Sequence, residues 1–100
     1  GGLTELLRIS SMAAAYDIPV VPHGSGAYSY HFVITQPHCP FCEYLNTSPD
    51  CLSFPSVFGN LFENEILPVN GKIKLNNEPG FGMKLNRKDL NLNRVFPSNE

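Results

Sequence analysis

Apolar residues in the first part of the chain change from a helical to a strand-like spacing. In residues 3–16, apolar side chains recur three and four positions apart, which is typical of an amphipathic helix that buries one stripe. Asp17 interrupts this pattern, and the short apolar run 18–22 predicts a strand buried on both faces, as in a parallel sheet. A helix followed by a tight turn and a buried strand is the recurring unit of α/β proteins.

The middle of the chain continues the α/β pattern. Residues 27–35 predict a short helix, and residues 37–40 predict a turn. Residues 41–45 predict a second short strand that carries Glu43. We therefore expect residues 1–50 to form regular α/β structure.

The second half, residues 51–100, is expected to consist of loops and short strands. The Asn-Gly pair at 70–71 lies between two apolar runs and predicts a type I′ hairpin turn. Residues 79–82 predict another turn, and residues 83–85 a last short strand. The tail 91–100 is not expected to form regular structure. We expect both halves to belong to one structural unit.

Size and charge restrict the class of protein. A chain of 100 residues is one small domain or a piece of a larger one. Charged residues make up 16%, below the roughly 25% usual for a globular protein, which indicates contact with further protein. The net charge is −2, so binding to nucleic acid or to an anionic membrane is not expected. The apolar runs are too short to span a membrane, and we expect a cytoplasmic location.

Two cysteines form a Cys-Pro-Phe-Cys motif. Cys39 and Cys42 in this arrangement resemble the active loop of glutaredoxins and thioredoxins, where a helix N-terminus activates the first thiol. In those folds a crossover helix and a parallel strand follow before a proline-containing segment, which Pro55 would represent here. The roughly one dozen residues between Cys42 and Pro55 are too few for both elements.

Zinc binding is a second possible role of the cysteines. Cys39, Cys42 and Cys51, together with His31 or His38, would supply four ligands. A structural zinc site normally needs a second pair of closely spaced ligands, which is absent. Three cysteines are also too few for a disulfide framework. The plain alternative is that they are small apolar residues of a core.

A histidine and a glutamate are the strongest candidates for acid–base chemistry. His23 follows the predicted strand 18–22, at the end where α/β folds place their chemistry. Glu43 lies among apolar neighbours, where a carboxylate is costly unless it is paired or lines a wet cavity. If the two strands are parallel neighbours, both side chains reach one crevice and can act as an acid–base pair. A purely structural histidine is the alternative.

Several motifs agree in order and spacing with one known family. Gly-Gly-Leu-Thr-Glu-Leu-Leu-Arg-Ile at 1–9 and Ala-Ala-Ala-Tyr-Asp-Ile-Pro-Val-Val-Pro-His-Gly-Ser at 13–25 resemble the late part of the enolase superfamily barrel, in its mandelate-racemase subgroup. Four shorter motifs narrow the resemblance to the L-rhamnonate dehydratases: Tyr-Ser-Tyr-His at 28–31, Thr-Ser-Pro-Asp at 47–50, Pro-Val-Asn-Gly-Lys at 68–72 and Pro-Gly-Phe-Gly at 79–82. The similarity extends from Gly1 to about Leu92.

This resemblance implies a (β/α) TIM-type barrel with a separate capping domain. It makes residues 3–16 the sixth barrel helix, residues 18–21 the seventh strand and residues 41–45 the eighth strand. Residues 51–100 would return toward the capping domain. The chain would then be an incomplete barrel, which accounts for its low surface charge.

The resemblance also implies a reaction and its residues. The family removes water from a sugar acid, with Mg²⁺ holding the enediolate, to give a 2-keto-3-deoxy acid. His23 corresponds to the general base that takes the α-proton and then protonates the departing hydroxyl. Glu43 corresponds to a glutamate that hydrogen-bonds the substrate or intermediate. Ser25 and His31 are expected to bind the substrate.

Essential parts of the family site do not occur in these 100 residues. The three metal carboxylates of the family lie on earlier strands, and the aspartate partner of His23 would fall just before Gly1. We therefore expect this chain alone to bind no Mg²⁺ and to be inactive. A stand-alone protein-binding module, or a small redox or zinc domain, remains an alternative. Exposed barrel edges would favour association, including homo-oligomers.

Overall fold

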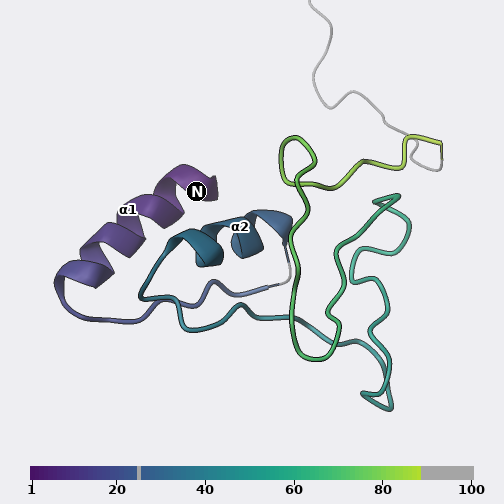
Figure 1. The fold of residues 1–100 in the computed structure, drawn as a ribbon, viewed down its shortest axis with the longest axis horizontal. Helices are drawn as coiled ribbons and strands as arrows, with labels where there is room; N and C mark the ends of the chain where they lie inside the picture. Colours follow the sequence, from purple (N-terminus) through teal and green to yellow (C-terminus); the bar gives the residue numbers. More distant parts are fainter. Residues whose placement is uncertain (25, 89–100) are drawn as a thin grey trace, which may run out of the picture.

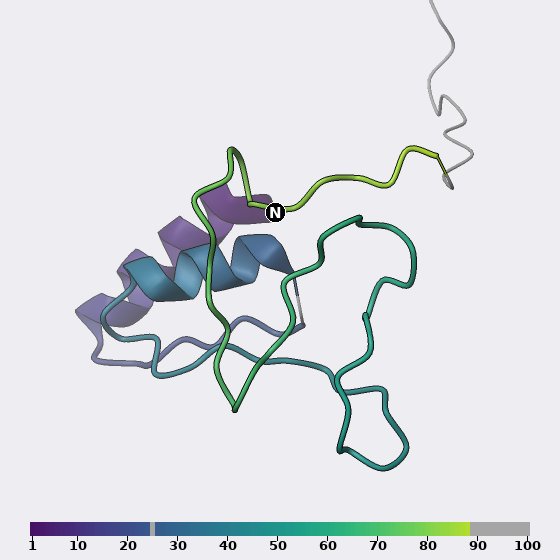
Figure 2. The same ribbon diagram turned by 45° about the vertical axis from the view of Figure 1, so that its right-hand side comes forward.

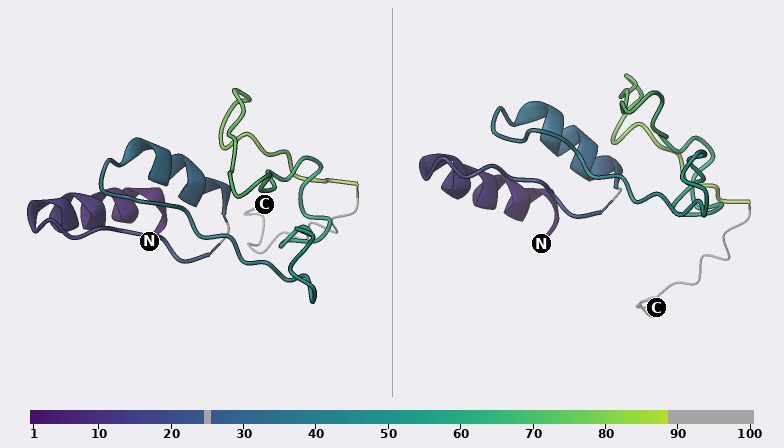
Figure 3. Two further views of the ribbon diagram at one scale, coloured as in Figure 1. Left: turned by 60° about the horizontal axis from the view of Figure 1, so that its bottom comes forward. Right: turned by 90° about the horizontal axis from the view of Figure 1, so that it is seen from below.

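The computed structural model describes residues 1–24 and 26–88, and its two helices lie together at one end of the molecule (Figures 1 and 3). Helix α1 (Gly2–Ala15) confirms the predicted amphipathic helix. It ends where Asp17 adopts a left-handed backbone with φ 54°. The amide of Asp17 donates to the Ala14 carbonyl and that of Ile18 to the Ala13 carbonyl, the two bonds of a Schellman motif.

Helix α2 (Ala27–Thr35) has the bounds predicted from the sequence. It packs along α1, and the two helices lie side by side in every view (Figures 1–3). The predicted turn at 37–40 is also confirmed, shifted by one residue, because the Cys39 amide donates to the Gln36 carbonyl. These elements are stabilised within short stretches of chain, so the sequence pattern is sufficient to locate them.

The strands predicted at 18–22 and 41–45 are not confirmed, because the structure assigns neither segment to a regular strand. The two segments nevertheless run alongside one another in the same direction beneath the helices (Figures 1 and 2). The Val20 amide donates to the His38 carbonyl at 3.3 Å. A central parallel strand takes such bonds repeatedly and from both sides. Ile18, expected to be buried, is 54% exposed.

Residues 46–88 form loops with short antiparallel contacts. The type I′ turn is confirmed, because Val69 and Lys72 exchange both main-chain hydrogen bonds while Asn70 and Gly71 adopt φ values of 51° and 70°. The turn at 79–82 is confirmed by the bond from the Gly82 amide to the Pro79 carbonyl. The strand expected at 83–85 is reduced to a single antiparallel bridge, Phe62 with Leu85. The tail 91–100 lies outside the described residues.

The apolar core of the described residues is small and centred on α2. Its buried apolar residues are Ala27, Tyr30, Phe32 and Ile66. The apolar stripe of α1 is not buried as predicted, since Leu7 is 43% and Ile9 55% exposed. The reason is that α2 covers one line of contact along α1, whereas a barrel helix needs a sheet beneath it to bury the full stripe. Within the described ranges, no helix has the length and apolarity needed to cross a membrane.

Candidate functional site

The parallel course of the two extended segments brings His23 next to Glu43. The Nδ1 atom of His23 lies 2.9 Å from the Oε2 atom of Glu43. The amide of Gly24 donates to the same carboxylate oxygen. Gly24 has a φ of 97°, a conformation that a residue with a Cβ rarely adopts, and this turn directs its amide toward Glu43. The imidazole is 86% exposed and the carboxylate 34%, so the pair is open to water.

The surroundings of Glu43 favour its ionised form. The hydrogen bond from the Gly24 amide is the main cause that lowers the pKa of the Glu43 carboxyl below its usual 4.5. Desolvation opposes this effect, and the contact with His23 lowers the pKa further. An ionised carboxylate can only accept hydrogen bonds, so Nδ1 of His23 is the donor. In the neutral ring, Nε2 then carries the lone pair. The arrangement therefore orients a histidine whose Nε2 can take up a proton.

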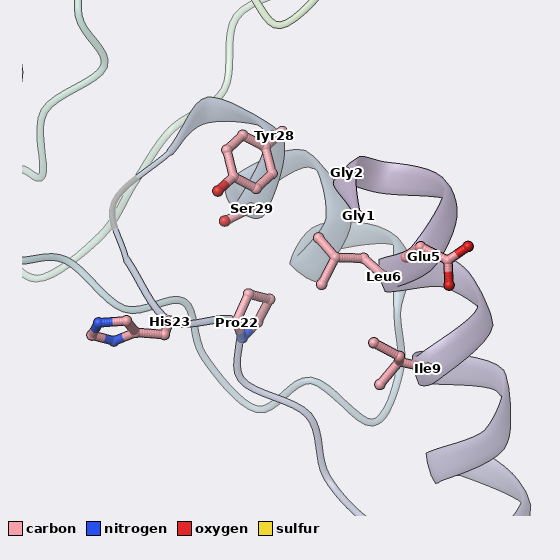
Figure 4. Close-up of a pocket in the computed structure, with 9 residues that line it drawn as sticks. All are labelled: Gly1, Gly2, Glu5, Leu6, Ile9, Pro22, His23, Tyr28 and Ser29. Atoms are coloured by element: carbon pink, nitrogen blue, oxygen red, sulfur yellow. The ribbon is translucent and has the colours of Figure 1, made fainter.

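A cavity of about 260 Å³ adjoins His23, between the first turns of α1 and α2 (Figure 4). Its lining residues are Gly1, Gly2, Glu5, Leu6, Ile9, Pro22, His23, Tyr28 and Ser29. Ser29 was not predicted from the sequence as an individual residue of this site. Its residue type gave no distinct signal, because Ser29 is one of several hydroxyl-bearing residues in 27–35.

Of the two residues expected to bind substrate, the structure describes only His31. Ser25 lies outside the described residues. The Nε2 atom of His31 donates to the Phe81 carbonyl at 3.2 Å, and the two rings are in tilted contact. His31 lines a different cavity, together with Leu3 and Leu7 of α1. Substrate binding by Ser25 and His31 therefore stays a prediction.

The cysteines have neither the environment of a redox thiol nor that of a metal site. Burial raises the pKa of the Cys39 thiol above its usual 9.0, opposed by the Val20 amide, whereas a redox loop lowers it. Within the part of the chain that the structure describes, no three His, Cys, Asp or Glu side chains gather closely enough to hold a metal ion. His38 instead contacts the hydroxyl of Ser10, a fully buried residue of α1. The redox and zinc alternatives thus gain no support.

Residues 1–89 match the family described as enolase C-terminal domain-like. The chain belongs to this family. The resemblance inferred from the sequence motifs is confirmed, and the fold is that of part of the TIM-barrel domain of the enolase family.

Relatives of this family member share about half of its residues. A putative L-rhamnonate dehydratase of Caldivirga maquilingensis is 48% identical over 98 residues, which cover 98% of this chain and 24% of the relative. The L-rhamnonate dehydratase of Saccharopolyspora erythraea is 48% identical over 96 residues, 96% of this chain and 24% of its own length. The chain therefore spans about a quarter of the length of these relatives.

Two crystal structures of the Gibberella zeae enzyme resemble this member of the enolase family in three dimensions. The L-rhamnonate dehydratase of that organism superposes with a TM-score of 0.77 at 54% identity, covering 88% of this chain and 23% of its own. Its rhamnonate dehydratase complexed with Mg superposes with a TM-score of 0.71 at 53% identity, covering 88% and 22%.

The residues described here do not fit the magnesium ion of that complex. Magnesium prefers near-octahedral coordination by oxygen atoms, with one or more carboxylates. No cluster of three potential ligands occurs in residues 1–24 and 26–88. The Glu43 carboxylate is already bonded to the Gly24 amide and His23.

Proposed function

We propose that this chain carries the proton-transfer residues of a sugar-acid dehydratase of the L-rhamnonate type. The observation that carries the proposal is the 2.9 Å contact between Nδ1 of His23 and Glu43, which leaves Nε2 as the basic atom. The relatives named L-rhamnonate dehydratase supply the substrate class. The activity belongs to a longer protein, and the 100-residue chain is inactive alone.

The proposed reaction needs one proton carrier. Nε2 of His23 takes the proton from the carbon next to the substrate carboxylate, and the electron pair of that C–H bond forms an enediolate. The C3–O bond then breaks, and the imidazolium returns its proton to the departing hydroxyl, which leaves as water. The resulting enol tautomerises to a 2-keto-3-deoxy acid. Glu43 holds His23 through Nδ1 and hydrogen-bonds the substrate or intermediate.

The fold supports a more specific placement in the barrel. We infer that α1 is the sixth barrel helix, residues 18–21 the seventh strand and residues 41–45 the eighth. The parallel course of the two extended segments, joined by the bond from Val20 to His38, supports this order. Residues 51–100 return toward a capping domain. The carboxylates that bind Mg²⁺ lie in other parts of the longer protein, whereas Glu43 is the partner at Nδ1 of His23 in this proposal.

A chimera tests the proposal directly. The stretch of the Saccharopolyspora erythraea enzyme that matches this chain is replaced by residues 1–100, and dehydration of L-rhamnonate is measured with Mg²⁺. We expect an active chimera. His23→Asn should lower kcat by roughly 10²–10⁴-fold, the usual contribution of a general base. Binding of Mg²⁺ should stay near normal, since His23 is not a metal ligand in the proposal.

His38→Asn is the matched control, because His38 is a histidine that contacts Ser10 rather than Glu43. The His38→Asn variant should have nearly the same kcat as the unmodified chimera. Exchange of the substrate C2 proton with D₂O, followed by NMR, reports the first step separately. A folded, Mg²⁺-binding chimera that neither dehydrates L-rhamnonate nor exchanges this proton would overturn the proposal. Loss of Mg²⁺ binding in His23→Asn would show that the role of His23 is wrong.

A further inference from the structure

Two consecutive residues of one loop hold a single oxygen atom of Glu43. The Gly24 amide donates to Oε2 of Glu43, and Nδ1 of His23 lies 2.9 Å from the same atom. The two donors differ in kind. The imidazole belongs to a side chain that is 86% exposed, and water and side-chain freedom weaken such a contact. The main-chain amide has no rotamers, so its direction depends only on the backbone at Gly24.

The backbone conformation of Gly24, rather than the space around it, accounts for a glycine at this position. Its φ is 97°, in the region that residues with a Cβ rarely adopt. A Cβ added to Gly24 would meet no atom of the described residues within 4 Å. A side chain therefore has room here. A residue that returned to negative φ would, however, change the direction of the amide relative to Glu43.

We propose that Gly24 is a positioning residue for the proton transfer, because its positive-φ backbone aims the amide at Glu43 and keeps the carboxylate against Nδ1 of His23. The lowered pKa of the Glu43 carboxyl supports this role, since the Gly24 amide is the main cause of the lowering. Gly24 acts through Glu43 and touches no substrate in this role. Its effect on turnover rests on the proposed function, whereas the bond between Gly24 and Glu43 is measurable without turnover.

Turnover of the chimera measures the effect of Gly24. Gly24→Ala should lower kcat/KM for L-rhamnonate about 3- to 10-fold, the contribution of one hydrogen bond. Gly24→Asn should lose less, because asparagine adopts positive φ more readily than alanine. Gly71→Ala is the matched control. Gly71 has a φ of 70°, an added Cβ would also meet no atom within 4 Å, and it lies in the turn between Val69 and Lys72. Gly71→Ala should have nearly the same kcat/KM as the unmodified chimera.

A double-mutant cycle distinguishes positioning from a general loss of structure. If Gly24 acts through Glu43, Gly24→Ala should cause no further loss in a chimera that already carries Glu43→Ala. A carboxyl-¹³C titration of the chimera, assigned with Glu43→Gln, is independent of activity. Gly24→Ala should raise the pKa of Glu43 toward 4.5, because the amide bond favours the ionised carboxylate. Gly71→Ala should leave that pKa unchanged.

The positioning role and the proposed function fail separately. An active chimera in which Gly24→Ala changes neither kcat/KM nor the pKa of Glu43 would overturn the role of Gly24 and leave the function standing. A loss that is equally large with and without Glu43→Ala would also overturn it, because Gly24 would then act elsewhere. If Gly24→Ala does not fold, the same measurements are made on Gly24→Asn. A raised Glu43 pKa in a folded but inactive chimera would support the Gly24–Glu43 bond while contradicting the function.

Discussion

Nδ1 of His23 lies 2.9 Å from Oε2 of Glu43, although neither residue belongs to a helix or a regular strand. The contact joins the loop after the 18–22 segment to the segment that follows α2. Gly24 strengthens it, because its amide donates to the same oxygen. Together, these contacts orient the imidazole of His23 and stabilise the ionised carboxylate of Glu43. The first two expected consequences concern these three residues.

Glu43 should determine the tautomer of His23. We expect ¹⁵N NMR of the neutral ring, recorded at low salt and low temperature, to show a larger share of the Nδ1–H tautomer in the unmodified chain than in Glu43→Ala. Glu43→Gln keeps an acceptor oxygen and should retain part of the preference. The pair is largely exposed, so added salt should weaken the effect. Equal tautomer populations in all three proteins would contradict the orienting role.

The ionisation of Glu43 should give the contact a defined pH dependence. Because the folded-state pKa is lowered below the usual 4.5, the contribution of Glu43 to stability is complete above that pH. It is lost as the pH falls below 4.5 and through the folded-state pKa. A carboxyl-¹³C titration should locate that pKa. His23→Ala should raise it only part of the way to 4.5, because the Gly24 amide is the larger cause; a complete return would assign the shift to His23 instead.

Ser10 should hold the two extended segments in place. It is fully buried, its Oγ donates to Gln36 at 2.8 Å and contacts Nε2 of His38 at 3.1 Å. The His38 carbonyl in turn accepts from the Val20 amide. Ser10→Ala should therefore lower the hydrogen-exchange protection of the Val20 amide by about 5- to 30-fold, which corresponds to 1–2 kcal/mol. Ser11→Ala, on the exposed side of the same helix, should leave that protection unchanged.

The thiol of Cys39 should react slowly with alkylating reagents at neutral pH. Burial raises its pKa above 9.0, so less than about 1% is thiolate at pH 7. Iodoacetamide should alkylate Cys39 more slowly than the exposed Cys51, and the rate at Cys39 should keep rising above pH 9. Mass spectrometry of the two peptides measures both rates. Rapid alkylation of Cys39 with an inflection well below pH 8 would restore the redox hypothesis.

The isolated chain should unfold over a broad temperature range. Four apolar residues are buried among the described residues, while large apolar side chains such as Met12 (68%) and Leu52 (84%) are exposed. Such a small core gives little cooperativity. Near-UV circular dichroism of the Tyr and Phe signals during heating, with and without Mg²⁺, measures this. A sharp transition that does not depend on Mg²⁺ would indicate a self-sufficient protein-binding module rather than part of a barrel.

Local patterns were sufficient for the elements that are stabilised by near neighbours in the chain. The bounds of α2, the turn at 70–71 and the end of α1 near Asp17 all follow from hydrogen bonds that close within six residues. The same reasoning did not suffice for residues 18–22, where the predicted strand is not confirmed. A strand exists only through its neighbours, and apolar spacing shows what a segment could bury rather than what lies beside it.

The sequence by itself determined the two helices, the tight turns, the family and the choice of His23 and Glu43 as candidates. Only the tertiary structure decided that Nδ1 of His23 is the atom that meets Glu43. It also decided that the Ser29 hydroxyl is buried with no hydrogen-bond partner among the described residues, and that His31 bonds Phe81 in another cavity. The physical reason is that the His23–Glu43 and His31–Phe81 contacts join segments far apart in the chain. Their geometry depends on how α1, α2 and the loops pack, which no local pattern encodes.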